Sequence, residues 1–246
     1  MRARKSNDGA GNRLRSGSGG VRLARSILAA AQAEAENAVD RFGAGRVDET
    51  GIAFVTIDPP GSMDLDQAVH IEKISTGYVV HYAIADVAAV VTPGGALDIE
   101  TRKRGQTFYL PDGSVPLHPP RALSEGSASL LPDVVRPAAL WRIELDAQAE
   151  PTSWQVRRAL VKSVARLDYS TVQRDADAGT LHPSIAALPE FGRLRSVSAV
   201  ARGAIELKLP EQSVFGISRR TSPRLAGGSN WSHAPKRTTG TQKCRC

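Results

Sequence analysis

The chain lacks the features that mark a membrane-bound protein, a secreted protein or a protein stabilised by a structural zinc site. Its most apolar stretch, residues 83–91, is interrupted by Asp86 and falls short of the ~20 residues that a helix needs to cross a bilayer. The N-terminus has no apolar segment of the kind found in secretory signals. The only two cysteines, Cys244 and Cys246, are badly spaced for a disulfide and supply too few ligands for a structural zinc site. These absences predict a cytoplasmic protein without a membrane segment.

The net charge of +7 is unevenly distributed. Residues 1–28 hold seven Lys and Arg against one acid, residues 212–246 hold seven against none, and residues 29–211 hold 18 against 24. Basic ends can bind nucleic acid by releasing its counterions, although solvated tails of this composition are common and often inert. Composition predicts a disordered basic arm over 1–20 and a disordered or aberrant basic tail over 213–246.

Between these ends, strand-like and helix-like segments alternate. The spacing of apolar residues predicts helices over 21–42, 97–104 and 191–201, with a helix and linker forming the unit 21–49. β-rich runs predict strands over 53–57, 69–74, 78–86, 138–145 and 154–164, and Ser-Thr-Gly joins the second and third as a hairpin. Trp141 and Trp154 are expected in the core. The mixture predicts an α+β (mixed α/β) fold, in which a mixed sheet has flanking helices.

An acidic segment follows the first predicted strand. Asp58 directly follows the strand, Pro-Pro-Gly forms a turn, and Asp64 and Asp66 come next. Residues two apart in extended backbone point the same way, so Asp64 and Asp66 can converge, and the turn can bring Asp58 to them. Adjacent carboxylates repel one another unless a cation neutralises them, and oxygen-only ligands suit Mg²⁺ or Mn²⁺ rather than zinc. On spacing alone, the alternative is a surface turn that is rich in aspartate.

Residues 54–70 read Phe-Val-Thr-Ile-Asp-Pro-Pro-Gly-Ser-Met-Asp-Leu-Asp-Gln-Ala-Val-His, which closely resembles the signature of the ribonuclease II (RNB) family. The resemblance continues in Tyr-Ala-Ile-Ala-Asp-Val (82–87), Pro-Gly-Gly-Ala-Leu-Asp (93–98) and Arg-Gly-Gln-Thr-Phe-Tyr-Leu-Pro (104–111). It resumes in Pro-Leu-His-Pro-Pro (116–120), Leu-Ser-Glu-Gly-Ser-Ala-Ser-Leu-Leu (123–131), Arg-Leu-Asp-Tyr-Ser-Thr-Val-Gln (166–173) and Leu-Pro-Glu-Gln (209–212). The chain is most similar to compact bacterial members, especially actinobacterial ones. The resemblance implies that residues 50–212 are the N-terminal portion of an RNB catalytic domain.

Members of that family degrade single-stranded RNA processively from the 3′ end and release nucleoside monophosphates by Mg²⁺-dependent hydrolysis. By position, the resemblance implies that Asp58 and Asp64 hold metal beside the scissile phosphate, and that Asp66, with Asp64, is catalytic. Gln67 stands where the family usually has a fourth aspartate, and its uncharged oxygen can still ligate a metal. Tyr109 matches an aromatic residue that packs against the terminal RNA base, a sequence-independent contact.

Arg102 and Arg104, on a predicted helix ahead of Tyr109, are candidate phosphate contacts, with a solvated helix face as the alternative. Asp86 is expected to support the fold. No preference for DNA is expected. Family members continue well beyond Gln212 and supply there an arginine that stabilises the transition-state phosphate, so the resemblance predicts a truncated domain with impaired activity. The alternative function is that of a non-catalytic RNA-binding or vestigial protein.

Overall fold

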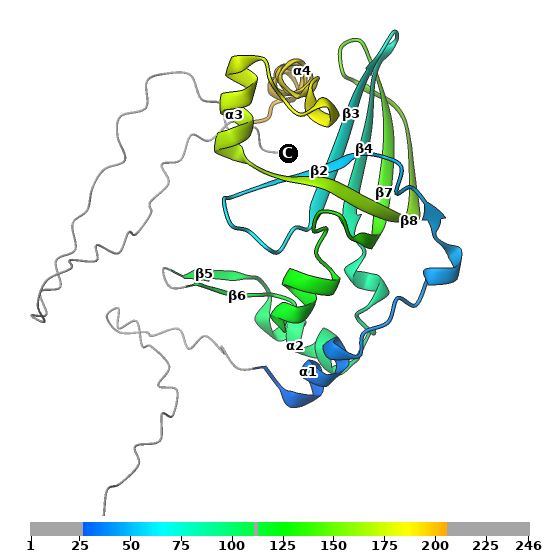
Figure 1. The fold of residues 1–246 in the computed structure, drawn as a ribbon, viewed down its shortest axis with the longest axis vertical. Helices are drawn as coiled ribbons and strands as arrows, with labels where there is room; N and C mark the ends of the chain where they lie inside the picture. The colour runs from blue at the N-terminus through cyan, green and yellow to red at the C-terminus, as the bar shows by residue number, and fades with distance from the viewer. Residues whose placement is uncertain (1–26, 111–112, 206–246) are drawn as a thin grey trace, which may run out of the picture.

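The computed structural model describes residues 27–110 and 113–205, so the predicted basic arm and basic tail lie outside the described residues (Figure 1). A mixed sheet with flanking helices forms the described part, which confirms the α+β fold predicted from the sequence. Among these residues, no helix combines the length and apolarity needed to cross a membrane.

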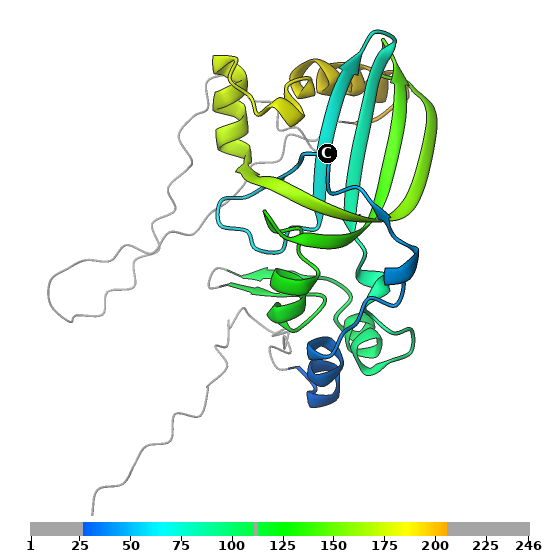
Figure 2. The same ribbon diagram turned by 45° about the vertical axis from the view of Figure 1, so that its right-hand side comes forward.

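The main sheet closes on itself. It contains β2 (Phe54–Asp58), β3 (Gln67–Ile74), β4 (Gly77–Ala85), β7 (Val135–Asp146) and β8 (Pro151–Asp168), with the short β1 (Val47–Asp48) added to β8. The pairs β2–β3, β3–β4, β4–β7 and β7–β8 are antiparallel, whereas β8 runs parallel to β2. Closure is possible because β8, at 18 residues, pairs with β7 along its first part and with β2 along its last part (Figure 2).

The predicted hairpin over β3 and β4 is confirmed, with Gln67 opposite Ile84 and Ile74 opposite Gly77. Gly77 has a φ of 147°, and a Cβ there would lie 2.1 Å from the carbonyl oxygen of Leu145 on the neighbouring strand. Only glycine fits such a close approach of two backbones.

Side chains alternate across the sheet and fill two cores. Phe54, Leu65 and Leu140 belong to the first, together with Ala83 and Val161. The second core lies on the opposite face and contains Val55, Ile71, Tyr78, Ile185 and Leu188. Here η4 (Pro183–Ile185) and α4 (Leu188–Ala201) cover the sheet, and α3 (Tyr169–Ala178) connects them to β8 (Figure 1).

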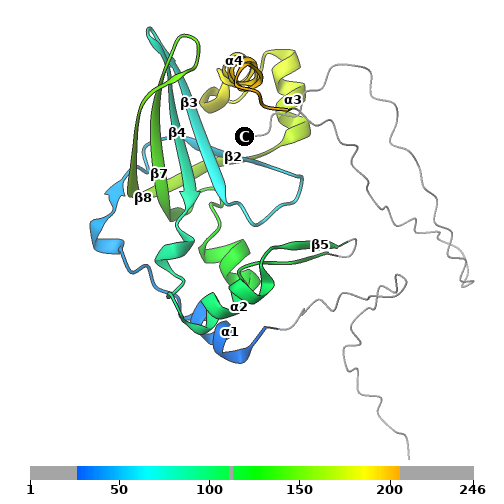
Figure 3. The same cartoon turned by 180° about the vertical axis from the view of Figure 1, so that it is seen from behind.

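A third group of elements lies beyond the ends of β3, β4 and β7, away from α4 (Figure 3). In it, α1 (Ala29–Glu36) and α2 (Ala96–Arg104) meet through the buried residues Ala31, Ala35, Leu97 and Leu123. The remaining elements of this region are η1 (Gly43–Gly45), η2 (Val87–Ala89), β5 (Phe108–Leu110), β6 (Gly113–Val115) and the π-helical turn η3 (Leu123–Ser127).

Several expectations from the sequence need correction. The predicted helix over 21–42 is described only as α1, and it ends at Asn37, whose side chain donates to the Ala33 carbonyl oxygen. The short strand β1, the hairpin β5–β6 and helix α3 have no counterpart among the predicted elements. Trp154 is 65% exposed and so is not a core residue, because residues 151–158 of β8 are all exposed. Helices α2 and α4 are confirmed.

Candidate functional site

The three aspartates lie at one edge of the sheet, around the loop that joins β2 to β3 (residues 59–66, here the carboxylate loop). Asp58 is the last residue of β2. A turn follows in which Ser62 N–H donates to the Pro59 carbonyl oxygen at 3.1 Å, and Gly61 adopts a φ of 85°. In Figures 1 and 3 the loop projects between α3 and the β5–β6 hairpin.

Leu65 fixes the side to which its two acidic neighbours turn. Its side chain is fully buried in the first core, whereas Asp64 is half-buried and Asp66 is exposed. Leu130 N–H donates to the Leu65 carbonyl oxygen and Ala85 N–H donates to that of Asp66, both at 2.9 Å. Burial of the Leu65 side chain therefore keeps the side chains of Asp64 and Asp66 turned toward the surface.

The three carboxylates are close enough to repel one another. Partial burial, followed by the charges of Asp64 and Asp66, raises the pKa of Asp58. Although Asp66 as a whole is exposed, desolvation of its carboxylate, followed by the charge of Asp64, raises its pKa. Among the described residues, no basic side chain forms an ion pair with any of the three. Their oxygen atoms are therefore available to a cation.

This repulsion predicts how the metal-free protein responds to Asp66→Asn. The folded chain keeps a proton on Asp66 at pH values where the unfolded chain, with an ordinary pKa of 3.8, has lost it. Stability therefore falls as the pH rises from about 3.8 through the raised pKa, and the loss persists at neutral pH. We expect the uncharged variant to melt at a higher temperature than the wild type at pH 7, and the difference to disappear below about pH 3.8. Scanning calorimetry with a chelator measures both, and a lower melting temperature for the variant at pH 7 would contradict the prediction.

The convergence expected from the sequence is incomplete as the side chains stand. No group of three or more His, Cys, Asp or Glu side chains within residues 27–110 and 113–205 is arranged to hold a metal ion. Gln67, the fourth expected ligand, accepts a hydrogen bond from the Tyr82 hydroxyl through Oε1, so one of its two lone pairs is already used. The donor set consists of oxygen atoms, which fits Mg²⁺, but it is not a finished ligand shell.

Tyr109 lies beside the carboxylates although it is far from them in sequence. Partial burial and then the charges of Asp64, Asp66 and Asp58 raise the pKa of its hydroxyl. The side chain is nevertheless 78% exposed, on strand β5 of the hairpin that faces the carboxylate loop (Figure 3). The fold thus brings an exposed aromatic ring to an anionic edge.

Comparison with known proteins identifies the family of the chain. The family model of the RNB domain matches residues 46–222, a wider range than the 50–212 indicated by the motifs. The chain belongs to the RNB family. Ribonuclease R of Escherichia coli (strain K12) is 34% identical over 195 residues, which cover 75% of this chain and 24% of that protein. Ribonuclease R of Acidithiobacillus ferrooxidans is 36% identical over 146 residues, which cover 59% of this chain and 33% of that protein.

Solved structures agree with this assignment. The structure of Mycoplasma genitalium RNase R in complex with double-stranded RNA matches with a TM-score of 0.70 at 29% identity, over 77% of this chain and 36% of that one. The structure of yeast Ssd1, a pseudonuclease, matches with a TM-score of 0.54 at 18% identity and shows likeness of fold alone. This RNB chain spans about a quarter to a third of the length of the curated relatives named above.

The two arginines predicted to contact RNA differ in accessibility. Arg102 is 77% exposed and pairs with Asp98 one helical turn earlier, at 3.1 Å. The side chain of Arg104 is only 6% exposed, and its guanidinium is held by Glu100 at 2.9 Å. The geometry favours Arg102 as a phosphate contact and gives Arg104 a structural role. Asp86 is also structural, as expected, because it is buried against Arg46.

Three residues that lie near the carboxylate loop were not assigned a role from the sequence. Asp168 pairs with Asp58 in the β2–β8 register, but its carboxylate caps α3, and hydrogen bonds from Ser170 and Thr171 lower its pKa to about 2. An Asp just before a helix is a recognisable capping signal. The other two, Arg166 and Ser129, contact the loop through its backbone, which no local pattern announces. Arg166 Nη1 donates to the Ser62 carbonyl oxygen at 3.1 Å.

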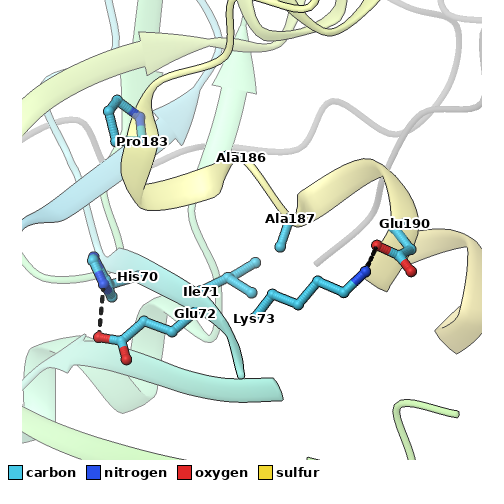
Figure 4. Close-up of a pocket in the computed structure, with 8 residues that line it drawn as sticks. All are labelled: His70, Ile71, Glu72, Lys73, Pro183, Ala186, Ala187 and Glu190. Atoms are coloured by element: carbon cyan, nitrogen blue, oxygen red, sulfur yellow. Dashed lines mark hydrogen bonds and ion pairs between the residues drawn. The ribbon is translucent and has the colours of Figure 1, made fainter. Parts of the chain in front are cut away.

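A separate open pocket of about 460 Å³ lies between β3 and the segment from η4 to α4 (Figure 4). Its polar groups already pair with one another, His70 Nε2 with Glu72 at 3.1 Å and Lys73 Nζ with Glu190 at 2.6 Å. The first of these residues, His70, lies three positions after Gln67 on β3. At ~3.3 Å per residue, the backbones of His70 and Gln67 are about 10 Å apart. None of the predicted site residues lines the pocket, so it is not the candidate site.

Proposed function

We propose that this chain is an RNB-type exoribonuclease that hydrolyses single-stranded RNA from the 3′ end to nucleoside monophosphates, with Mg²⁺ or Mn²⁺ as cofactor. The observation that carries the proposal is the edge formed by Asp58, Asp64 and Asp66, three mutually repelling carboxylates without a basic partner among the described residues. Membership of the RNB family and similarity to ribonuclease R proteins support it. A cytoplasmic location remains a prediction.

Asp58, Asp64 and Asp66 would hold the cation, with the Gln67 amide oxygen as a further donor. A bound cation would offset the repulsion among the three carboxylates. When bound, Mg²⁺ supplies charge that stabilises the phosphodiester oxygens and makes water a better nucleophile.

The protein's own residues provide position and a hydrogen-bond acceptor. Tyr109 would stack on the terminal base and so set how far the strand enters. Exposed Arg102 would contact a backbone phosphate. Asp66 is exposed, so its carboxylate can also accept a hydrogen bond from the attacking water.

The test uses the full chain with a 5′-labelled single-stranded oligoadenylate and Mg²⁺. We expect shortening from the 3′ end, release of 5′-monophosphates, loss of activity with a chelator, and little reaction with DNA of the same sequence. Endonucleolytic fragments, or cleavage that a chelator does not affect, would rule out the proposed mechanism.

The second candidate is a non-catalytic RNA-binding protein. The incomplete ligand set and the hydrogen bond from Tyr82 to Gln67 favour it, and the likeness to a pseudonuclease shows that this fold does not require activity. RNA binding without monophosphate release, in a chain that melts cooperatively, would support this alternative.

Tyr109→Ala is expected to weaken binding of single-stranded RNA by about 1–3 kcal/mol, the usual worth of one stacked base. Tyr109→Phe should bind like the wild type, because stacking needs the ring and not the hydroxyl. Fluorescence anisotropy with labelled RNA and a chelator, so that no cleavage occurs, measures both affinities.

The control is Trp154→Ala. Trp154 is also an exposed aromatic residue, but it lies 14 positions before Asp168, the β8 partner of Asp58. It should leave RNA affinity unchanged. An equal loss of RNA affinity in Tyr109→Ala and Trp154→Ala would show that Tyr109 does not stack on the RNA base.

A further inference from the structure

One buried side chain ties the carboxylate loop to the body of the protein. The Ser129 hydroxyl donates to the Met63 carbonyl oxygen at 2.6 Å and accepts a hydrogen bond from Leu65 N–H at 3.0 Å. These two groups belong to the peptide units immediately before and immediately after Asp64. A single hydroxyl therefore holds the backbone on both sides of this carboxylate.

Main-chain hydrogen bonds extend the attachment across Asp66. The peptide unit before Asp66 is held by Leu130 N–H, and the unit after it by Ala85 N–H. Only a proline substitution would remove these backbone donors, and it would also change the backbone conformation. Among the described residues, Ser129 is the only side chain bonded to the peptide units that flank Asp64, so it is the point at which the attachment can be tested.

Ser129 is itself held firmly. It is fully buried. Arg136 Nε donates to its carbonyl oxygen at 3.0 Å, and Arg136 Nη2 donates to that of Gly126 at 2.9 Å. The hydroxyl thus projects from a fixed turn into the carboxylate loop, and an alanine at this position would leave the buried Leu65 N–H and the Met63 carbonyl oxygen without this partner.

We infer that Ser129 is a positioning residue, which holds the backbone around Asp64, and through the next peptide unit that of Asp66, so that both carboxylates face the place proposed for the divalent cation. The inference rests on the proposed function. Metal ligands need support because a site that is loose by about 1 Å loses function, and removal of a supporting hydrogen bond typically weakens metal binding or activity by about 10–100-fold.

The test is Ser129→Ala in the full chain, with Mg²⁺ affinity measured by isothermal titration calorimetry. We expect about tenfold weaker Mg²⁺ binding or more, and a lower kcat with an unchanged KM for RNA. If the alanine variant does not fold, Ser129→Cys, which keeps a weak donor and acceptor, takes its place and should show a smaller loss.

The matched control is Ser184→Ala. Ser184 is 2% exposed, and its hydroxyl donates to the Ala53 carbonyl oxygen at 2.6 Å, on the opposite core of the sheet. This substitution removes the same kind of hydrogen bond, so it should lower the melting temperature without changing Mg²⁺ affinity. Equal loss of Mg²⁺ affinity in both variants would overturn the inference, because general destabilisation would then explain the effect.

Amide hydrogen exchange at Leu65 in the metal-free protein gives a second readout. Exchange should accelerate in Ser129→Ala and stay unchanged in Ser184→Ala; an unchanged rate in Ser129→Ala would overturn the inference. If the wild type neither binds Mg²⁺ nor cleaves RNA, the proposed function fails, and the exchange rate still decides whether Ser129 holds the loop.

Discussion

Asp66→Asn is expected to reduce monophosphate release at saturating RNA and Mg²⁺ by at least about 10²–10³-fold, the scale for losing one preorganised electrostatic group at a reacting centre. Asparagine keeps the shape of the side chain but removes its charge and its capacity to accept a proton. Single-turnover kinetics measure the chemical step. RNA affinity in the absence of Mg²⁺ should not fall, because the variant has one negative charge fewer near the phosphates.

Asp146→Asn is the matched control. Asp146 lies opposite Gly77, at the end of β4 away from Gln67, and its Oδ1 accepts hydrogen bonds from backbone N–H groups that an asparagine oxygen can also accept. Its activity should equal that of the wild type. If Asp66→Asn retained wild-type activity, the carboxylate loop would not be the reaction centre.

Arg46→Met is expected to lower the free energy of unfolding by about 3–5 kcal/mol, the cost of removing one partner from a buried ion pair. The Arg46 side chain is fully buried, and its guanidinium bonds Asp40 and, at 2.8 Å, Asp86. It also reaches the carbonyl oxygens of Ala138 at 3.4 Å and Ala159 at 3.5 Å. One side chain thus joins the segment after α1 to β7, β8 and the end of β4.

Methionine fills similar space but leaves Asp86, only 7% exposed, with the half-exposed Arg158 at 3.3 Å in place of its buried partner. The pKa values support strong pairing, because the Arg46 guanidinium lowers the pKa of Asp40 while the two carboxylates raise that of Arg46. Urea denaturation followed by circular dichroism measures the loss. The Asp40 contribution is present above its ordinary pKa of 3.8 and disappears as the pH falls through the lowered value.

Lys73→Met provides the comparison. Lys73 and Glu190 form an ion pair, but their side chains are 57% and 44% exposed, and such surface pairs contribute about 0–1 kcal/mol. Equal destabilisation by the Arg46 and Lys73 variants would show that burial of the Arg46 network adds nothing.

Local sequence signals predicted local structure well. The Ser-Thr-Gly turn gave the β3–β4 hairpin, and apolar spacing gave α2 and α4, because these elements depend on contacts within a short stretch of chain. Prediction failed where distant contacts decide. Strand β8 is long because it pairs first with β7 and then with β2. Trp154 is exposed because it lies in residues 151–158, all of which are exposed.

The candidate site shows the same division. Asp58, Asp64 and Asp66 are adjacent in sequence, so a strand, a Pro-Pro-Gly turn and alternation were enough to predict that they share an edge. Tyr109 was placed by resemblance, and the fold brings it to that edge through the β5–β6 hairpin. RNA contact by Arg104 stays a prediction, and Glu100, one helical turn away, holds its guanidinium and leaves the side chain only 6% exposed.

By itself, the sequence determined the family, the mixed α+β character and the acidic residues that are candidates for chemistry, since these depend on residue types and short spacings. Only the tertiary structure decided that Leu65 is buried, that Ser129 grips the peptide units around Asp64, and that Arg46 joins four segments. Apart from the pair of Arg46 with Asp40, these contacts join residues that lie far apart in the chain. No local pattern encodes the bonds of Ser129 and those of Arg46 to Ala138 and Ala159, because one partner in each is a backbone group that every residue carries.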